Sequence, residues 1–203
     1  MQFKLAKGCN VKDLSGIEEG YEFNDNGKFV TFTLNISREN IEKYFFHLAS
    51  YVNKPSFFLL EHPTNEKIEK KLRKSDESPT HKDVYYRDNL DFEDLSSIWD
   101  KCSNFCLDCG MTNFGFGSHE GIDEVFITRY KICYILSGNH EKYLNALAEL
   151  NMPHVEKLKT VWDNINYENP GETSSLKFED KTIYDVVEDL KEDGLYFYEH
   201  RED

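Results

Sequence analysis

Apolar residues recur at helical spacing in several segments, and the clearest of these spans residues 91–110. Its apolar and cysteine residues fall at intervals of three and four, which is the pattern of one buried helix face. Asp91 is placed to act as the N-cap, with Asp94 at the third helical position, and Gly110 is expected to end the helix in the left-handed conformation. The stripe consists of Leu95, Ile98, Trp99, Cys102, Cys106 and Cys109.

The remaining helical patterns are shorter and are bounded by capping and breaking residues. They lie between Ser37 and Pro55 and over residues 65–74, 139–151 and 182–193. In the second of them Ile68 and Leu72 are expected to face inward, and Gly194 is expected to stop the last.

Between the helical segments, apolar and polar residues alternate as they do in half-buried strands. Phe32, Leu34 and Ile36 alternate with polar residues, and Asn26 and Gly27 supply a turn ahead of them. Strands are expected over residues 2–6, 28–36, 57–60, 84–86 and 195–198, with two more within residues 112–137 that a turn or bulge near Thr128 and Arg129 separates.

The strands alternate in polarity instead of being wholly apolar, which favours a sheet with one solvated face. We therefore predict an α+β fold, organised as a single domain over residues 1–203. It should contain a mixed or largely antiparallel sheet with about five helices packed on it.

Charge is the most unusual feature of the composition, because 24 basic and 38 acidic residues give a formal net charge of −14. Such a field repels nucleic acid and favours encounter with a basic protein. The longest uninterrupted apolar run covers residues 132–136, much shorter than a membrane span requires. No secretory signal pattern is present, so we expect a cytoplasmic protein that contacts no membrane.

The negative charge is concentrated near the C-terminus, where residues 179–203 hold ten acidic and three basic side chains. This segment also contains tyrosines, which often anchor protein interfaces. We therefore expect a partner-binding surface formed by Glu188, Asp189, Glu192 and Asp193, with Tyr196 and Tyr198 as aromatic anchors.

Residues 115–124 contain more side chains of the types used in catalysis than any other short segment, and they leave an enzymatic alternative open. His119 with Glu120 or Asp123 could act as an acid–base group in a hydrolase. The segment lacks the patterns of a nucleophile elbow and of a dinucleotide loop, however. The favoured interpretation is structural: Phe114 and Phe116 face the core, and the glycines beside them allow a close neighbouring backbone.

Five cysteines are present, and three of them, Cys102, Cys106 and Cys109, could bind zinc together with His119. Their helical spacing instead favours burial as small apolar residues, with redox chemistry as a further alternative. We expect reduced cysteines, no metal and no cofactor.

The second half of the chain resembles a group of small, uncharacterised bacterial cytoplasmic proteins. The residues that carry this resemblance are Gly115-Phe116-Gly117-Ser118-His119, Asp123-Glu124, Arg129-Tyr130, Trp162-Asp163 and Pro170-Gly171. In overall character, a short acidic α+β chain without a catalytic signature, the protein is similar to immunity proteins that neutralise bacterial toxins. The resemblance implies toxin binding and brings no functional residues with it.

Overall fold

The structure is a computed structural model that describes residues 3–203. Its helices are α1 (Ile41–Ala49), α2 (Glu66–Leu72), α3 (Phe92–Asp108), α4 (His140–Glu149) and α5 (Ile183–Lys191). Its strands are β1 (Cys9–Asn10), β2 (Gly20–Asp25), β3 (Val30–Asn35), β4 (Ser56–Pro63), β5 (His81–Leu90), β6 (Asn113–Ser118), β7 (Glu124–Ile127), β8 (Ile132–Ser137), β9 (Glu172–Thr173) and β10 (Tyr196–Glu202).

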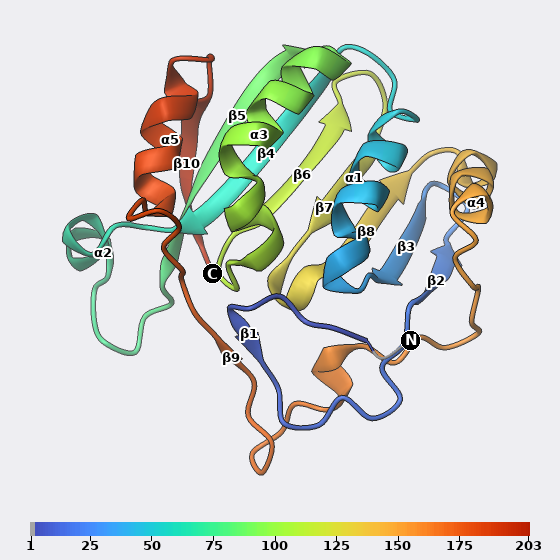
Figure 1. The fold of residues 1–203 in the computed structure, drawn as a ribbon, viewed down its shortest axis with the longest axis horizontal. Helices are drawn as coiled ribbons and strands as arrows, with labels where there is room; N and C mark the ends of the chain where they lie inside the picture. The colour runs from blue at the N-terminus through green and yellow to red at the C-terminus, as the bar shows by residue number, and fades with distance from the viewer. Residues whose placement is uncertain (1–2) are drawn as a thin grey trace.

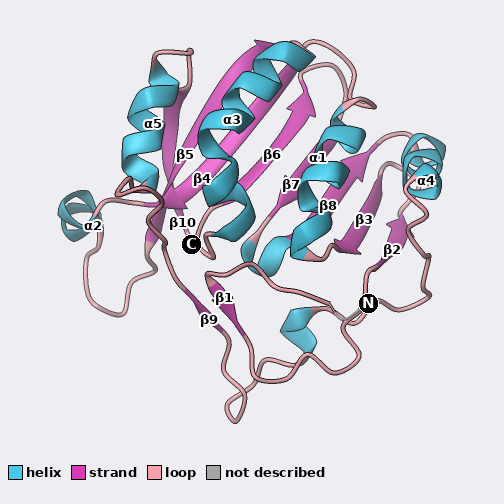
Figure 2. Cartoon of the chain, in the orientation of Figure 1, coloured by secondary structure: helices cyan, strands magenta, loops and turns pink. Residues whose placement is uncertain are grey.

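Eight strands form one antiparallel sheet in the order β10-β5-β4-β6-β7-β8-β3-β2, and β1 pairs with β9 in a small second sheet (Figure 1). Helices α1, α3 and α5 lie side by side on one face of the large sheet (Figure 2). The prediction of an α+β domain with five helices and a largely antiparallel sheet is confirmed.

The core lies between this sheet face and the helices. From the sheet, Phe114 and Phe116 of β6 are 0% and 3% exposed. From the helices, Phe45 of α1 stacks on Trp99 of α3 at 4.6 Å between ring centroids. Burying side chains of this size contributes about 2–3 kcal/mol each. The predicted inward orientation of Phe114 and Phe116 is confirmed.

The opposite sheet face, which we call the open face, carries the alternate residues of each strand. On β4 these are Phe57, Leu59 and Glu61, while Phe58 and Leu60 point toward the helices. The alternation in the sequence therefore identified a sheet that helices cover on one side only.

Several local predictions are confirmed. Asp91 and Asp94 form a reciprocal capping box at the start of α3. Gly194 follows α5 with φ of +90°. The turn at Asn26 and Gly27 joins β2 to β3, and a turn of residues 129–131 separates β7 from β8 as expected.

Other local predictions are wrong, each for a physical reason. Gly110 is not left-handed, because α3 ends at Asp108 and Gly110 instead allows a close backbone approach: a Cβ there would lie 2.0 Å from the Gly8 carbonyl oxygen. The Ser37 hydroxyl makes no cap and accepts a hydrogen bond from the Lys4 amide. Ile68 is 38% exposed, because α2 lies at the end of the sheet and buries none of its residues.

The strand predictions err mainly by omission. Residues 3–6 form no strand, and residue 2 lies outside the described residues. β2 was missed because its alternation is short, and β6 because glycine occupies every second position. Helix α1 ends at Ala49, so Pro55 does not set its end.

Candidate protein-binding surface

The four acidic residues predicted to meet a partner lie on the exposed side of α5 and in the turn after it. Three of them form ion pairs within the chain: Glu188 with Lys191, Asp189 with Lys181, and Asp193 with Lys101. Glu192 forms no ion pair within residues 3–203. Exposed pairs of this kind add little stability, so a partner's cations can replace the internal lysines at small cost.

Tyr196 and Tyr198 lie on β10 and point to the open face. Their rings lie 6.5 Å and 5.3 Å from the ring of Tyr86 on β5, and Tyr86 packs at 5.4 Å against Phe57 on β4. His119 completes the group at 5.0 Å from Phe57. We call Tyr196, Tyr198, Tyr86, Phe57 and His119 the aromatic cluster.

A β-bulge explains why both tyrosines are available. The register of β10 against β5 shifts between Phe197 and Glu199, so Tyr198 is the extra residue. A bulge of this kind re-aims side chains at a sheet edge. Tyr196 is 42% exposed and Tyr198 60% exposed, although both rings also pack against Tyr86.

Asp88 of β5 holds the aromatic cluster in place. Its Oδ1 lies 2.8 Å from Nε2 of His119, and its Oδ2 accepts a hydrogen bond of 2.7 Å from the Tyr196 hydroxyl. This bond to the carboxylate raises the pKa of Tyr196 to about 12. These two contacts restrict the rings of Tyr196 and His119, and a side chain that is already ordered loses less entropy in any further contact.

Two glycines of β6 make room for rings on the open face. A Cβ on Gly117 would lie 2.5 Å from Cζ of Phe57, and one on Gly115 would lie 2.3 Å from the Val125 carbonyl oxygen. The predicted role of these glycines in close packing is therefore confirmed, and Gly117 makes room for a ring of the aromatic cluster.

A charged group is buried beside this surface. Glu61 of β4 is 3% exposed and accepts hydrogen bonds from Arg201 of β10 at 2.7 Å and from Asn113 of β6 at 3.0 Å. Glu124 of β7 has a raised pKa, chiefly because burial disfavours its charged form. The pattern of β4 could have indicated Glu61, since it is the one carboxylate in a mainly apolar strand.

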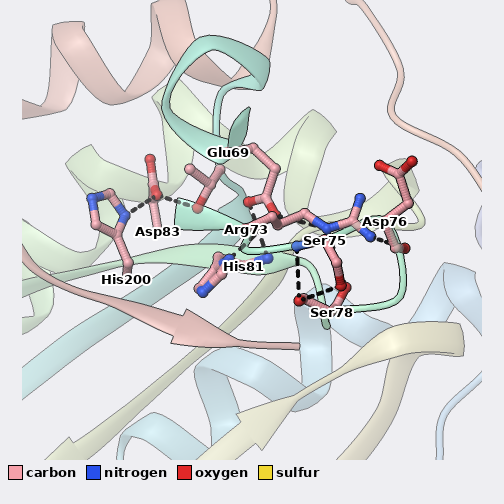
Figure 3. Close-up of polar contacts among 9 residues, drawn as sticks. Glu69, Arg73, Ser75, Asp76, Ser78, His81, Asp83 and His200 are labelled. Atoms are coloured by element: carbon pink, nitrogen blue, oxygen red, sulfur yellow. Dashed lines mark hydrogen bonds and ion pairs between the residues drawn. The ribbon is translucent and has the colours of Figure 1, made fainter. Parts of the chain in front are cut away.

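The other side of β10 is fastened as well. His200 Nδ1 lies 2.8 Å from Oδ1 of Asp83, which also accepts a hydrogen bond from Thr64. Figure 3 shows His200 and Asp83 pointing toward one another, with His81 beside Glu69 of α2. Polar contacts on both faces therefore hold β10 against β5.

The predicted acids and tyrosines do not form one continuous patch. The acids lie with α5 on the helix-covered side, and the tyrosines lie on the open face, with edge strand β10 between them. Together they surround the C-terminal edge of the sheet on two sides.

The residues of the enzymatic alternative are placed apart. His119 bonds to Asp88, whereas Asp123 accepts hydrogen bonds from Ser137 and Lys142. The neighbouring hydroxyl, that of Ser118, donates to the Glu120 carbonyl oxygen. The structure thus gives His119 a carboxylate that sequence reasoning missed, because β5 lies 31 residues away along the chain.

All five cysteines are buried and unpaired. Cys102 and Cys106 are fully buried on the inner stripe of α3, as predicted, with 3.7 Å between their sulfur atoms. Burial raises the pKa of the Cys106 thiol well above its ordinary value. Within the described residues, no three His, Cys, Asp or Glu side chains are grouped to hold a metal ion.

No helix within residues 3–203 combines the length and apolar character needed to span a membrane. No protein-family model, curated protein or solved structure matches the chain. The function must therefore be argued from the geometry of the surface itself.

Proposed function

We propose that this protein binds a basic protein through the β10 end of its sheet, as an immunity protein binds and neutralises a cytoplasmic toxin. The proposal rests on one observation about Tyr196 and Tyr198. Both rings are exposed, and both are held in place by packing against the ring of Tyr86. Ordered, exposed tyrosines are frequent energetic centres of protein interfaces.

Charge supports a basic partner. The net charge of −14 attracts cations, and the acids on and just after α5 lie on the other side of β10 from the exposed tyrosines. Such acids increase the association rate more than the affinity, and salt screens their effect over about 8 Å at physiological ionic strength. We therefore expect salt-sensitive association with tyrosine-dependent affinity.

The test begins with the full-length protein as bait in its native cells, followed by purification of any basic protein recovered. Tyr198→Ala should weaken binding of that protein at least tenfold, because an aromatic anchor is lost. The matched control is Tyr167→Ala, since Tyr167 is fully exposed in a distant loop. Calorimetry or biolayer interferometry gives both dissociation constants.

A second variant pair tests the charge argument. Glu188→Lys with Glu192→Lys should slow association and reduce its salt dependence, whereas Glu156→Lys near the opposite sheet edge should change neither. Co-expression of the protein should rescue cells from the partner. Recovery of only acidic proteins or nucleic acid, or binding that ignores both variant pairs, would rule the proposal out.

One observation keeps a hydrolase as the second candidate: the 2.8 Å contact between His119 and Asp88, which resembles the base and orienting group of hydrolytic sites. In this version His119 acts as acid–base group with Asp88, in place of Glu120 or Asp123. If a broad substrate screen finds an activity and His119→Ala retains it, this candidate is removed.

A further inference from the structure

The outer edge of β10 is open along its whole length. Its inner edge pairs with β5 from Tyr196 opposite Tyr86 to Glu202 opposite His81. Within residues 3–203, no backbone group pairs with the outer edge. An open edge offers unpaired N–H and C=O groups to another strand.

The opposite edge of the same sheet is closed. On β2, the Tyr21 amide donates to the Pro153 carbonyl oxygen at 3.0 Å, and the Val155 amide donates to the Tyr21 carbonyl oxygen at 2.9 Å. The His154 ring also lies 5.2 Å from the Tyr21 ring. A segment of the chain's own backbone therefore covers β2, while nothing equivalent covers β10.

The charges on β10 protect its edge against acidic strands and not against basic ones. Edge strands are commonly guarded by proline, charged side chains or bulges. β10 contains neither proline nor lysine, Arg201 is bonded to Glu61 and Glu199, and the bulge at Tyr198 leaves residues 199–202 in regular register with β5. Four regular residues after the bulge remain available to an added strand.

β10 is also held in the geometry that an added strand needs. His200 is bonded to Asp83 on one face, and Arg201 to Glu61 on the other (Figure 3 shows the first pair). A template ordered in advance reduces the entropy cost of binding an extended segment.

The charge around this edge selects the occupant. Glu199 and Glu202 lie on β10, Glu188 lies on α5, and Glu192 lies in the turn after it. A second copy of the chain would bring its own net charge of −14 to this edge, whereas a basic segment would be attracted.

We propose that the outer edge of β10 receives an extended, basic segment of the protein partner as a ninth strand of the sheet. This inference rests on the proposed function and specifies how the partner docks. Side chains of an added strand alternate between the two faces, so one set would meet Tyr196 and Tyr198 and the other would approach the acids of α5.

The test uses a synthetic probe and does not require the natural partner. The probe is a capped, dye-labelled eight-residue peptide in which lysine alternates with valine. The control peptide has the same sequence and charge, with every second backbone nitrogen methylated so that it cannot complete a strand ladder. Fluorescence anisotropy measures binding of each peptide to the full-length protein at low and moderate salt.

We expect the unmodified peptide to bind at least tenfold more tightly than the methylated one, and amide exchange of residues 196–202 to slow when it is bound. Tyr198→Ala should weaken the peptide complex, whereas Tyr167→Ala should not. Equal binding of the two peptides, binding of neither, or protection located away from β10 would overturn the inference. So would self-association of the free protein through β10.

These outcomes separate the two proposals. If a basic partner is recovered and depends on Tyr198 while the two peptides bind equally, strand addition fails and the proposed function stands. If no basic partner is recovered, the proposed function fails whatever the peptides do.

Discussion

In the middle of strand β4, two residues that face the helices and two that face away are buried to nearly the same extent. Phe58 and Leu60 are each 0% exposed beneath the helices, and Leu59 and Glu61 are 2% and 3% exposed on the open face. The first pair is covered by a second layer of structure. The second pair is covered by side chains of other strands of the same sheet, as where Arg201 of β10 reaches across β5 to Glu61.

This difference shows that one sheet can bury residues in two ways with different tolerances. The helix-covered face is packed with rings and aliphatic groups, so a lost side chain leaves a cavity there. The open face is covered by long polar and aromatic side chains that also meet solvent. It can therefore exchange its contacts with a partner without exposing the core.

The largest effect is expected on the covered face. Phe45→Ala removes the ring that stacks on Trp99 and should lower the free energy of unfolding by about 3–5 kcal/mol, because the surrounding helices cannot close the cavity. Chemical denaturation measures the loss. A loss below about 1 kcal/mol would mean that the helices close around the cavity, so that the helix-covered face tolerates a lost side chain as readily as the open face does.

The next effect tests the open face. Arg201→Ala removes the ion-pair partner of the buried Glu61 carboxylate and should cost about 2 kcal/mol in the free energy of unfolding, less than for a fully buried pair because Arg201 is half exposed. Arg201→Lys should recover part of this loss, since it restores the charge without the planar geometry. If the wild-type protein and both variants are equally stable, solvent and not Arg201 stabilises the charge of Glu61.

Low pH should reduce the free energy of unfolding through Asp108, which lies at the end of α3 on the helix-covered side of the sheet. Its side chain is 1% exposed and contacts Arg38 and Lys7, and although burial opposes the shift, hydrogen bonds from these cations lower its pKa to about 2. A lowered pKa stabilises the fold above the unfolded-state pKa of 3.8, and this contribution disappears as the pH falls through 2.

The loss at low pH should be about 2 kcal/mol, since one pKa unit corresponds to about 1.4 kcal/mol. Denaturation at pH 5 and pH 2 measures it, and Asp108→Asn, already less stable at pH 5, should show a smaller further loss. The same pH dependence in both proteins would exclude Asp108 as its source.

The smallest effect has the opposite sign. Burial raises the pKa of Glu124 on the open face, so its ionised form destabilises the fold as the pH rises above the unfolded-state value. Glu124→Gln should therefore stabilise the protein at pH 7, by less than about 1 kcal/mol, and bring no gain at pH 3. Destabilisation at pH 7 would show that attraction to Arg201 outweighs burial.

The sequence predicted the parts of the fold that depend on local patterns. The α3 stripe, its capping box at Asp91 and the turn at Gly27 all follow from spacing within a few residues. Gly110 was misjudged because its role depends on Gly8, about one hundred residues away. No local pattern reports such an approach.

The sequence predicted which residue types form the candidate site better than it predicted how those residues are arranged. Exposed aromatic and acidic residues near the C-terminus are visible in the sequence, and Tyr196, Tyr198 and Glu192 are indeed exposed. Their separation by β10 is not visible, because it depends on which face each residue takes after the bulge. Asp88 was also missed, since its link to His119 requires the pairing of β5 with β4 and β4 with β6.

The pairing of β10 with β5 has a consequence for synthesis on the ribosome. β5 ends at Leu90, and the strand that completes its free side begins at Tyr196, more than one hundred residues later. At about 5–20 residues per second, the nascent chain carries β5 without this neighbour for roughly 5–20 seconds. The newborn protein thus exposes, on β5, the same kind of edge that the finished protein exposes on β10.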